Sequence, residues 1–92
     1  MNLRLDLSKR ARKFLDQLPP KQFRQVVGKL FDLMANPDRQ DVQALKGSVY
    51  WRADIGEYRI VFTIDAEAET LRVPLIGNRN DGAVYDELRR LT

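Results

Sequence analysis

Apolar residues recur at three- and four-residue intervals from Ser8 to Met34, which is the spacing of amphipathic helices. Ser8 is a favourable N-cap for a first helix, and the prolines of "LPP" end that helix. Pro20 suits the first turn of a second helix, where its missing N–H costs nothing, and "ANP" ends this helix at Asn36. The short connection predicts an antiparallel pair. The expected core positions are Ala11, Phe14, Leu15 and Leu18, then Phe23, Val26, Val27, Leu30, Phe31 and Met34.

Alternation of apolar and polar residues predicts strands on either side of this helix pair. The expected strands cover 2–7, about 48–55, 58–64 and 70–77. Residues 37–47 are expected to form a polar loop, and 81–91 a short closing helix. Pro74 indicates that the last strand lies at an edge or carries an irregularity. The residues expected to face inward are Leu3, Leu5 and Leu7 in the first strand and Leu71, Val73 and Leu75 in the last, with Arg72 outward.

The stretch "WRADIGEYRIVF", residues 51–62, predicts a hairpin with Gly56 and Glu57 in a two-residue type II′ turn. Counting outward from the turn gives an apolar face that pairs Ile55 with Tyr58, Ala53 with Ile60, Trp51 with Phe62 and Val49 with Ile64. This pairing places Trp51 in the core. The other face pairs Asp54 with Arg59, Arg52 with Val61 and Tyr50 with Thr63.

Together these elements predict a single α+β domain over residues 1–92, in the order βααβββα. The N-terminal antiparallel helix pair covers one face of a small antiparallel sheet. The opposite face is left open for function or for a partner. That open face is expected to carry Tyr50, Arg52, Asp54, Arg59, Val61 and Arg72.

The chain contains no cysteine and no histidine, so the usual ligands of a metal site and the usual acid–base catalyst are absent. Any catalysis must use Lys, Arg, Tyr or carboxylates, and no cofactor is expected. The N-terminus lacks the apolar run of a signal peptide and no stretch is long enough to span a membrane, so a cytoplasmic protein is expected. The net charge of +3 comes with eleven arginines and five lysines. This bias fits either a phosphate-bearing partner or a GC-rich genome.

The order of elements, together with "LKG", "WRADIGEYRIVF" and "IGNRNDGAVY", resembles the RelE toxins of bacterial toxin–antitoxin systems. The resemblance covers nearly the whole chain. It implies a toxin that docks in the ribosomal decoding site and cuts messenger RNA there without a metal, using the RNA 2′-hydroxyl as nucleophile. It also implies a cognate antitoxin that wraps around the toxin. The expected antitoxin contacts lie along the helix pair and near Leu88 and Leu91.

Carried over by motif, the resemblance implies four catalytic positions, Arg52, Arg59, Arg79 and Tyr85. Arg59 and Arg79 would stabilise charge on the phosphoryl oxygens, and Arg52 would hold the RNA backbone. Tyr85 would stack on a base or donate a proton, unless it simply packs on the sheet. Lys46 and Arg72 are the expected additional RNA contacts.

Asp54 departs from the family pattern, because the best-characterised members place a second Lys or Arg there. A carboxylate between Arg52 and Arg59 has a lowered pKa and is a poor base, so Asp54 is expected to orient the two arginines. The structural alternative is an exposed salt bridge between Asp54 and Arg59, which contributes only about 0–1 kcal/mol. Two other functions stay open. One is a ParE-like poison of DNA gyrase, and the other is a degenerate toxin that binds its antitoxin without cutting RNA.

Overall fold

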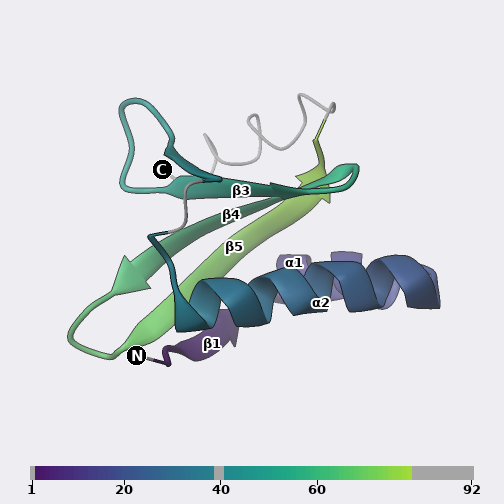
Figure 1. Cartoon of the computed structure of the whole chain (residues 1–92), viewed down its shortest axis with the longest axis horizontal. Coiled ribbons are helices and arrows are strands. Elements are labelled where there is room, and N and C mark those ends of the chain that lie inside the picture. The colour runs from purple at the N-terminus through teal and green to yellow at the C-terminus, as the bar shows by residue number, and fades with distance from the viewer. Residues whose placement is uncertain (1, 39–40, 80–92) are drawn as a thin grey trace.

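The computed structural model describes residues 2–38 and 41–79. A five-stranded sheet has the strand order β1-β5-β4-β3-β2, and both helices lie on one of its faces (Figure 1). This arrangement confirms the expected α+β fold with an N-terminal helix pair. Neither helix of the described chain combines the length and the apolar composition needed to cross a membrane. The elements are β1 (Arg4–Leu7), α1 (Lys9–Asp16), α2 (Pro20–Ala35), β2 (Val42–Ala44), β3 (Trp51–Ile55), β4 (Tyr58–Asp65) and β5 (Thr70–Asn78).

The sheet is mixed, so the expectation of a purely antiparallel sheet was wrong. β1 pairs in parallel with β5, and the other neighbours are antiparallel. Alternation along a strand decides which side chains face the core, but it carries no information about the direction of a distant partner. A short edge strand, β2, also forms inside the predicted loop 37–47. The predicted closing helix at 81–91 lies outside the described residues.

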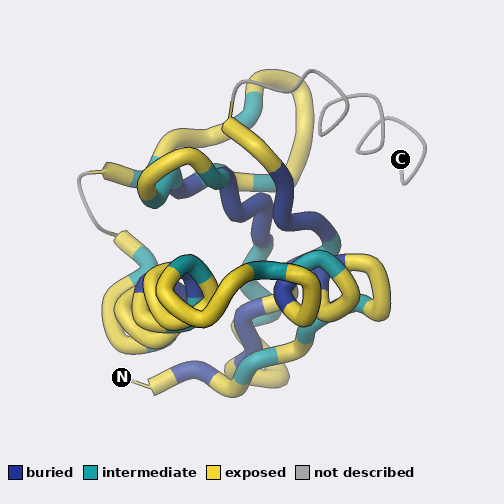
Figure 2. Tube along the Cα trace, turned by 90° about the vertical axis from the view of Figure 1, so that its right-hand side faces the viewer, coloured by how far each residue is buried: buried dark blue, intermediate teal, exposed yellow. Residues whose placement is uncertain are grey.

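The helix boundaries follow the predicted caps. The Ser8 hydroxyl oxygen accepts a hydrogen bond from the Ala11 backbone N–H at 3.0 Å, and Pro20 occupies the first turn of α2. The apolar stripe of α2 is centred on the buried residues Val26, Leu30 and Leu33 (Figure 2). Phe23 and Phe31 were expected in the core, but they lie on the borders of this stripe and are 38% and 60% exposed.

The hairpin has the predicted register from Trp51–Phe62 through Ile55–Tyr58. Gly56 has φ of +58°, the value that the first central position of a type II′ turn requires. Trp51 nevertheless remains 42% exposed, so its predicted place in the core was wrong. α1 packs against β1 and β5, and α2 packs against β3, but Trp51 at the start of β3 has little cover.

A bulge in β5 changes which residues face the helices. Val61 pairs with Leu75 whereas Thr63 pairs with Arg72, so β5 holds one extra residue opposite β4 at Val73 and Pro74. This confirms that Pro74 marks an irregularity, and β5 is not an edge strand. Beyond the bulge the alternation is inverted, so the prediction that Leu75 faces inward beside Val73 was wrong.

Leu75 instead contacts Val61 on the face opposite the helices, and Ile76 takes the place in the helix-side core. Leu45 and Tyr50 pack against the Val61–Leu75 pair. The face opposite the helices, which we continue to call the open face, is therefore covered at its apolar centre, so the expectation that Val61 is uncovered was wrong. Polar and charged groups lie at both ends of this face.

Two glycine-to-alanine substitutions should have opposite effects on stability. Gly56→Ala should destabilise the fold by roughly 1–2 kcal/mol, because an L residue is strained at positive φ. The new Cβ would also lie 3.1 Å from the Gln25 side chain. Gly28→Ala, in α2 with no atom near the new Cβ, should stabilise it by about 1 kcal/mol. Urea denaturation of both variants tests this, and equal effects of the two substitutions would contradict the assignment of the turn.

Candidate functional site

Three arginines lie on or next to β3, β4 and β5, close enough to Asp54 to act on its charge. Arg52 lies on β3, Arg59 on β4, and Arg79 directly follows β5. The Arg79 backbone N–H donates to the Glu57 carbonyl at 2.7 Å, which ties the end of β5 to the hairpin turn. All three positive charges act on the carboxylate of Asp54. We call Arg52, Arg59 and Arg79 the arginine cluster.

Arg59 is buried, with 7% of its surface exposed, although it was expected on an open surface. It lies on the central strand β4, paired with Asp54 of β3 on one side and Gly77 of β5 on the other. Its guanidinium donates through Nε to Asp54 Oδ1 at 2.7 Å and through Nη2 to Oδ2 at 3.1 Å. A two-bond contact of this kind fixes the plane of the guanidinium. The pair is therefore more than the exposed salt bridge that the sequence left as an alternative.

The pKa of Asp54 is lowered, chiefly by the hydrogen bonds from Arg59. Partial burial acts in the opposite direction, and the charges of Arg59, Arg52 and Arg79 add to the lowering. Asp54 is thus a carboxylate near neutral pH and a weak proton acceptor. This agrees with the expectation that it orients arginines.

The lowered pKa makes a pH-dependent contribution to stability. A carboxyl group with a lower pKa in the folded state stabilises the fold above its unfolded pKa, and this contribution is lost as the pH falls through the folded value. Asp54→Asn should therefore be less stable than the wild type near pH 7, and the difference should shrink below about pH 4. Urea denaturation from pH 7 to pH 2 measures it. Glu57→Gln in the adjacent turn is the control, and a difference for Asp54→Asn that stays constant with pH would contradict the linkage.

Gln43 was missed by the sequence analysis. It lies on β2 opposite Arg52, and its side-chain oxygen accepts a hydrogen bond from Arg52 Nη2. Gln43 was read as part of a polar loop, and nothing local in the sequence placed it beside Arg52. This contact restrains Arg52 next to Asp54. Arg52 and Arg59 therefore each have a polar partner that orients the guanidinium, Gln43 for Arg52 and Asp54 for Arg59.

The other predicted RNA contacts lie outside the arginine cluster. Lys46 is exposed in the turn after β2. Arg72 pairs with Thr63 of β4. Thr63 is four residues from Arg59 along the same strand, which separates Arg72 from Arg59 by roughly 13 Å. Tyr85 lies outside the described residues.

The Arg72 guanidinium is held by two carboxylates, Asp6 at 2.6 Å and Asp65 at 3.0 Å. The hydrogen bond that Arg72 donates to Asp65, and then the one that it donates to Asp6, raise the pKa of Arg72. Two carboxylates around one guanidinium leave a net negative charge at Arg72, whereas in the arginine cluster the charges of three arginines act on the single carboxylate of Asp54. The three arginines of the cluster remain the better candidates for phosphate contacts.

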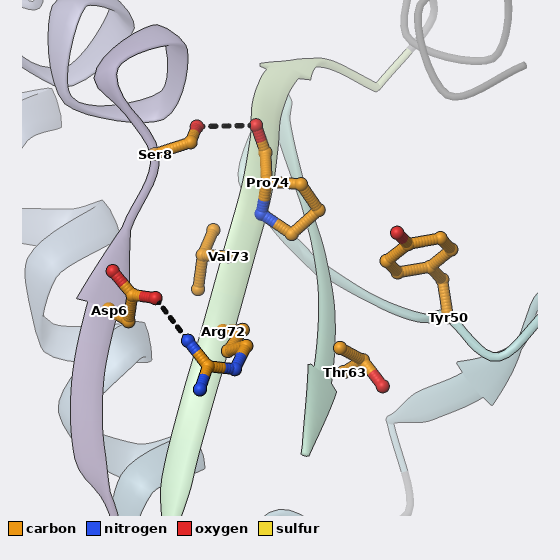
Figure 3. Close-up of a pocket in the computed structure, with 7 residues that line it drawn as sticks. All are labelled: Asp6, Ser8, Tyr50, Thr63, Arg72, Val73 and Pro74. Carbon is orange, nitrogen blue, oxygen red and sulfur yellow. Dashed lines mark hydrogen bonds and ion pairs between the residues drawn. The ribbon is translucent and has the colours of Figure 1, made fainter. Parts of the chain in front are cut away.

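A hollow of about 210 Å³ lies on the same face, beyond the Val61–Leu75 pair (Figure 3). The Ser8 hydroxyl donates to the Pro74 carbonyl at 2.6 Å, and the Thr63 hydroxyl donates to the Val49 carbonyl at 3.1 Å. The open face thus offers two separate polar regions. The residues that line the hollow are Asp6, Ser8, Tyr50, Thr63, Arg72, Val73 and Pro74.

Comparison with known families gives a match that covers most of the chain. Residues 5–81 match the family model described as the ParE toxin of a type II toxin–antitoxin system, parDE. No curated protein matches the chain.

Solved structures with the same fold come from bacteria and archaea. A chain of the toxin–antitoxin complex RelBE2 from Mycobacterium tuberculosis is 27% identical, with a TM-score of 0.77 over 88% of this chain and 95% of that one. A chain of the RelE–RelB complex from Pyrococcus horikoshii is 24% identical, with a TM-score of 0.75 over 87% and 98%. A mutant of the E. coli toxin RelE in the free state is 22% identical, with a TM-score of 0.83 over the full length of both chains. The two matches below 25% identity establish the likeness of fold alone.

Proposed function

Because the chain belongs to the ParE toxin family of type II toxin–antitoxin systems, we propose that this toxin cuts messenger RNA on the ribosome. The observation that carries the proposal is the arginine cluster, with Arg59 buried and held in a fixed plane by Asp54. The pairing with Asp54 allows this charge to be buried, and it belongs to a residue that the RelE motif assigns to catalysis. On this proposal the toxin acts in the cytoplasm, on translating ribosomes.

The chemistry needs few protein groups, because RNA carries its own nucleophile in the 2′-hydroxyl. Attack on the adjacent phosphorus forms a cyclic phosphate and expels the 5′-oxygen of the next nucleotide. Negative charge grows on the phosphoryl oxygens, and fixed cationic donors stabilise it best. Arg59 and Arg79 take this role, and Arg52 holds the RNA backbone from the Gln43 side. Tyr85 is the proposed group that stacks on a base or protonates the leaving oxygen.

Asp54 acts in this proposal as a positioning residue. Its lowered pKa makes it a poor general base, while its two hydrogen bonds set the orientation of Arg59. The proton of the 2′-hydroxyl then leaves to a group of the ribosome or to water. This supports ribosome dependence, because the toxin alone does not supply a strong base within the described residues.

The antitoxin is the second proposed partner. Phe23 and Phe31 are exposed along the outer border of α2, and large exposed aromatic residues are typical of protein contacts. The M. tuberculosis and P. horikoshii relatives were solved as toxin–antitoxin complexes. We therefore place one antitoxin contact along α2, as the helix-pair prediction expected.

A gyrase poison is the second candidate, and the description of the matching family model favours it. The arginine cluster supports RNA cleavage instead, because the positive charges of three arginines around one carboxylate suit the phosphate of an RNA substrate. A supercoiling assay with purified gyrase separates the two. Inhibition of supercoiling without any RNA cleavage would favour the gyrase poison.

The decisive experiment is primer extension on a defined messenger RNA incubated with purified toxin, with and without translating ribosomes. We expect discrete cuts within codons that appear only when ribosomes are present. Cuts on naked RNA would support the nuclease activity but contradict its dependence on the ribosome. An absence of cuts in both reactions would overturn the proposed function.

A further inference from the structure

The hollow beyond the Val61–Leu75 pair has the composition of a small binding site. Arg72 on β5 pairs with Thr63 on β4, and Tyr50, just before β3, lies on the other side of Thr63. The three side chains together cover about two strand spacings, roughly 10 Å. Figure 3 shows the Tyr50 ring across from the Pro74 ring, with Thr63 and Arg72 below them in this view. The volume of about 210 Å³ is smaller than the roughly 300–1,000 Å³ typical of drug-sized ligands, so it suits a single planar ring system.

Arg72 gives the hollow a fixed set of hydrogen-bond donors. Asp6 bonds one terminal nitrogen and Asp65 bonds the other, so the guanidinium is held from two sides. Two of its five N–H groups are used by these bonds, and the others have no partner among the described residues. A fork held in this way can donate two parallel hydrogen bonds to adjacent acceptor atoms.

The charges around Arg72 disfavour a phosphate. One guanidinium faces two carboxylates, Asp6 and Asp65, so the local charge is negative. A neutral ligand with acceptor atoms avoids this repulsion. Among nucleobases, guanine presents two such atoms, O6 and N7, on one edge, and arginine is their usual bidentate donor. An aromatic side chain such as Tyr50 supplies the stacking surface that an unpaired base requires.

We propose that this hollow binds a guanine base of the RNA, stacked on Tyr50 and read by Arg72. That the guanine belongs to an RNA rests on the proposed function. The hollow and the arginine cluster share one sheet face, roughly 13 Å apart along β4, so the base belongs to a nucleotide near the cleaved bond. Arg72 then determines sequence preference and takes no part in the cleavage step.

The first test is an NMR titration of the full-length toxin with guanosine 5′-monophosphate. The amide signals of Tyr50 and Thr63 should move, and Arg72→Lys should weaken the affinity about tenfold, as the loss of a bidentate base contact does. Arg12→Lys on α1 is the matched control, because it makes the same exchange on the other face without change of charge. Ribose 5-phosphate should leave both signals unmoved. Signals that do not respond to the nucleotide, or that respond equally to the sugar phosphate, would overturn the guanine site.

The second test compares cleavage maps on translating ribosomes. Wild-type toxin should favour guanine at one fixed distance from the cut, and Arg72→Lys should reduce this preference about tenfold while cutting continues. Cutting whose base preference is unchanged in Arg72→Lys would overturn the guanine site and leave the proposed function intact. Nucleotide binding without any cutting would support the site and overturn the nuclease.

Discussion

Replacing Arg59 with alanine should reduce the rate of ribosome-dependent cleavage by about 10²–10³-fold, the usual loss when one fixed donor to a developing charge is removed. Arg59 is the buried member of the arginine cluster, and its guanidinium is oriented by two bonds to Asp54. Single-turnover primer extension on stalled ribosomes measures the rate directly.

Two further variants separate catalysis from folding at this position. Arg59→Lys keeps the charge but loses the planar fork, so it should recover only part of the lost rate. Arg12→Ala, on the exposed side of α1, removes an arginine from the other face and should cut at the wild-type rate. Urea denaturation of each variant establishes that the protein under assay is folded. A folded Arg59→Ala protein that cuts as fast as the wild type would remove Arg59 from the mechanism.

Phe62→Ala should lower the free energy of unfolding by about 3–5 kcal/mol, the range for removal of a buried aromatic side chain. Phe62 is 1% exposed at the centre of the helix-side core, where Leu30 and Leu71 belong to the same cluster. Denaturant unfolding followed by circular dichroism gives the value, with the slope compared between variants to verify that the unfolding transition is unchanged.

The same exchange at Phe31 provides the matched control. Phe31 is 60% exposed on α2, so Phe31→Ala should change the free energy of unfolding by no more than about 0.5 kcal/mol. Antitoxin binding measured on the same protein then tests the proposed role of this surface, because a folded Phe31→Ala protein should bind more weakly. A large loss of stability at Phe31 would contradict the position of α2 on the sheet.

The parts of the fold that were predictable are those determined by neighbouring residues. Ser8 and Pro20 mark where the helices begin, and Gly56 sets the hairpin turn from which the register follows by counting. The parts that were missed depend on pairings between segments rather than on the pattern within one segment. The parallel pairing of β1 with β5 and the pairing of β2 with β3 join segments whose own patterns say nothing about one another.

The candidate site shows the same division. Counting from Gly56 placed Arg52, Asp54 and Arg59 on one face, as the structure has them. The burial of Arg59 was not predictable, because it depends on what covers the centre of the sheet. Gln43 was missed for the reason that β2 was missed, since three residues are too few to show alternation.

The parallel pairing of β1 with β5 also has a consequence for how the chain folds. The contacts from β1 and its following cap to β5, such as Asp6 with Arg72 and Ser8 with Pro74, each span 66 residues. Loops of this length close at a higher entropic cost than the two-residue turn between β3 and β4, and non-local pairings slow folding. β1 is synthesised before β5, but it cannot pair in the sheet until β5 has been made. Nearly all of the described chain must be made before this protein has a complete sheet.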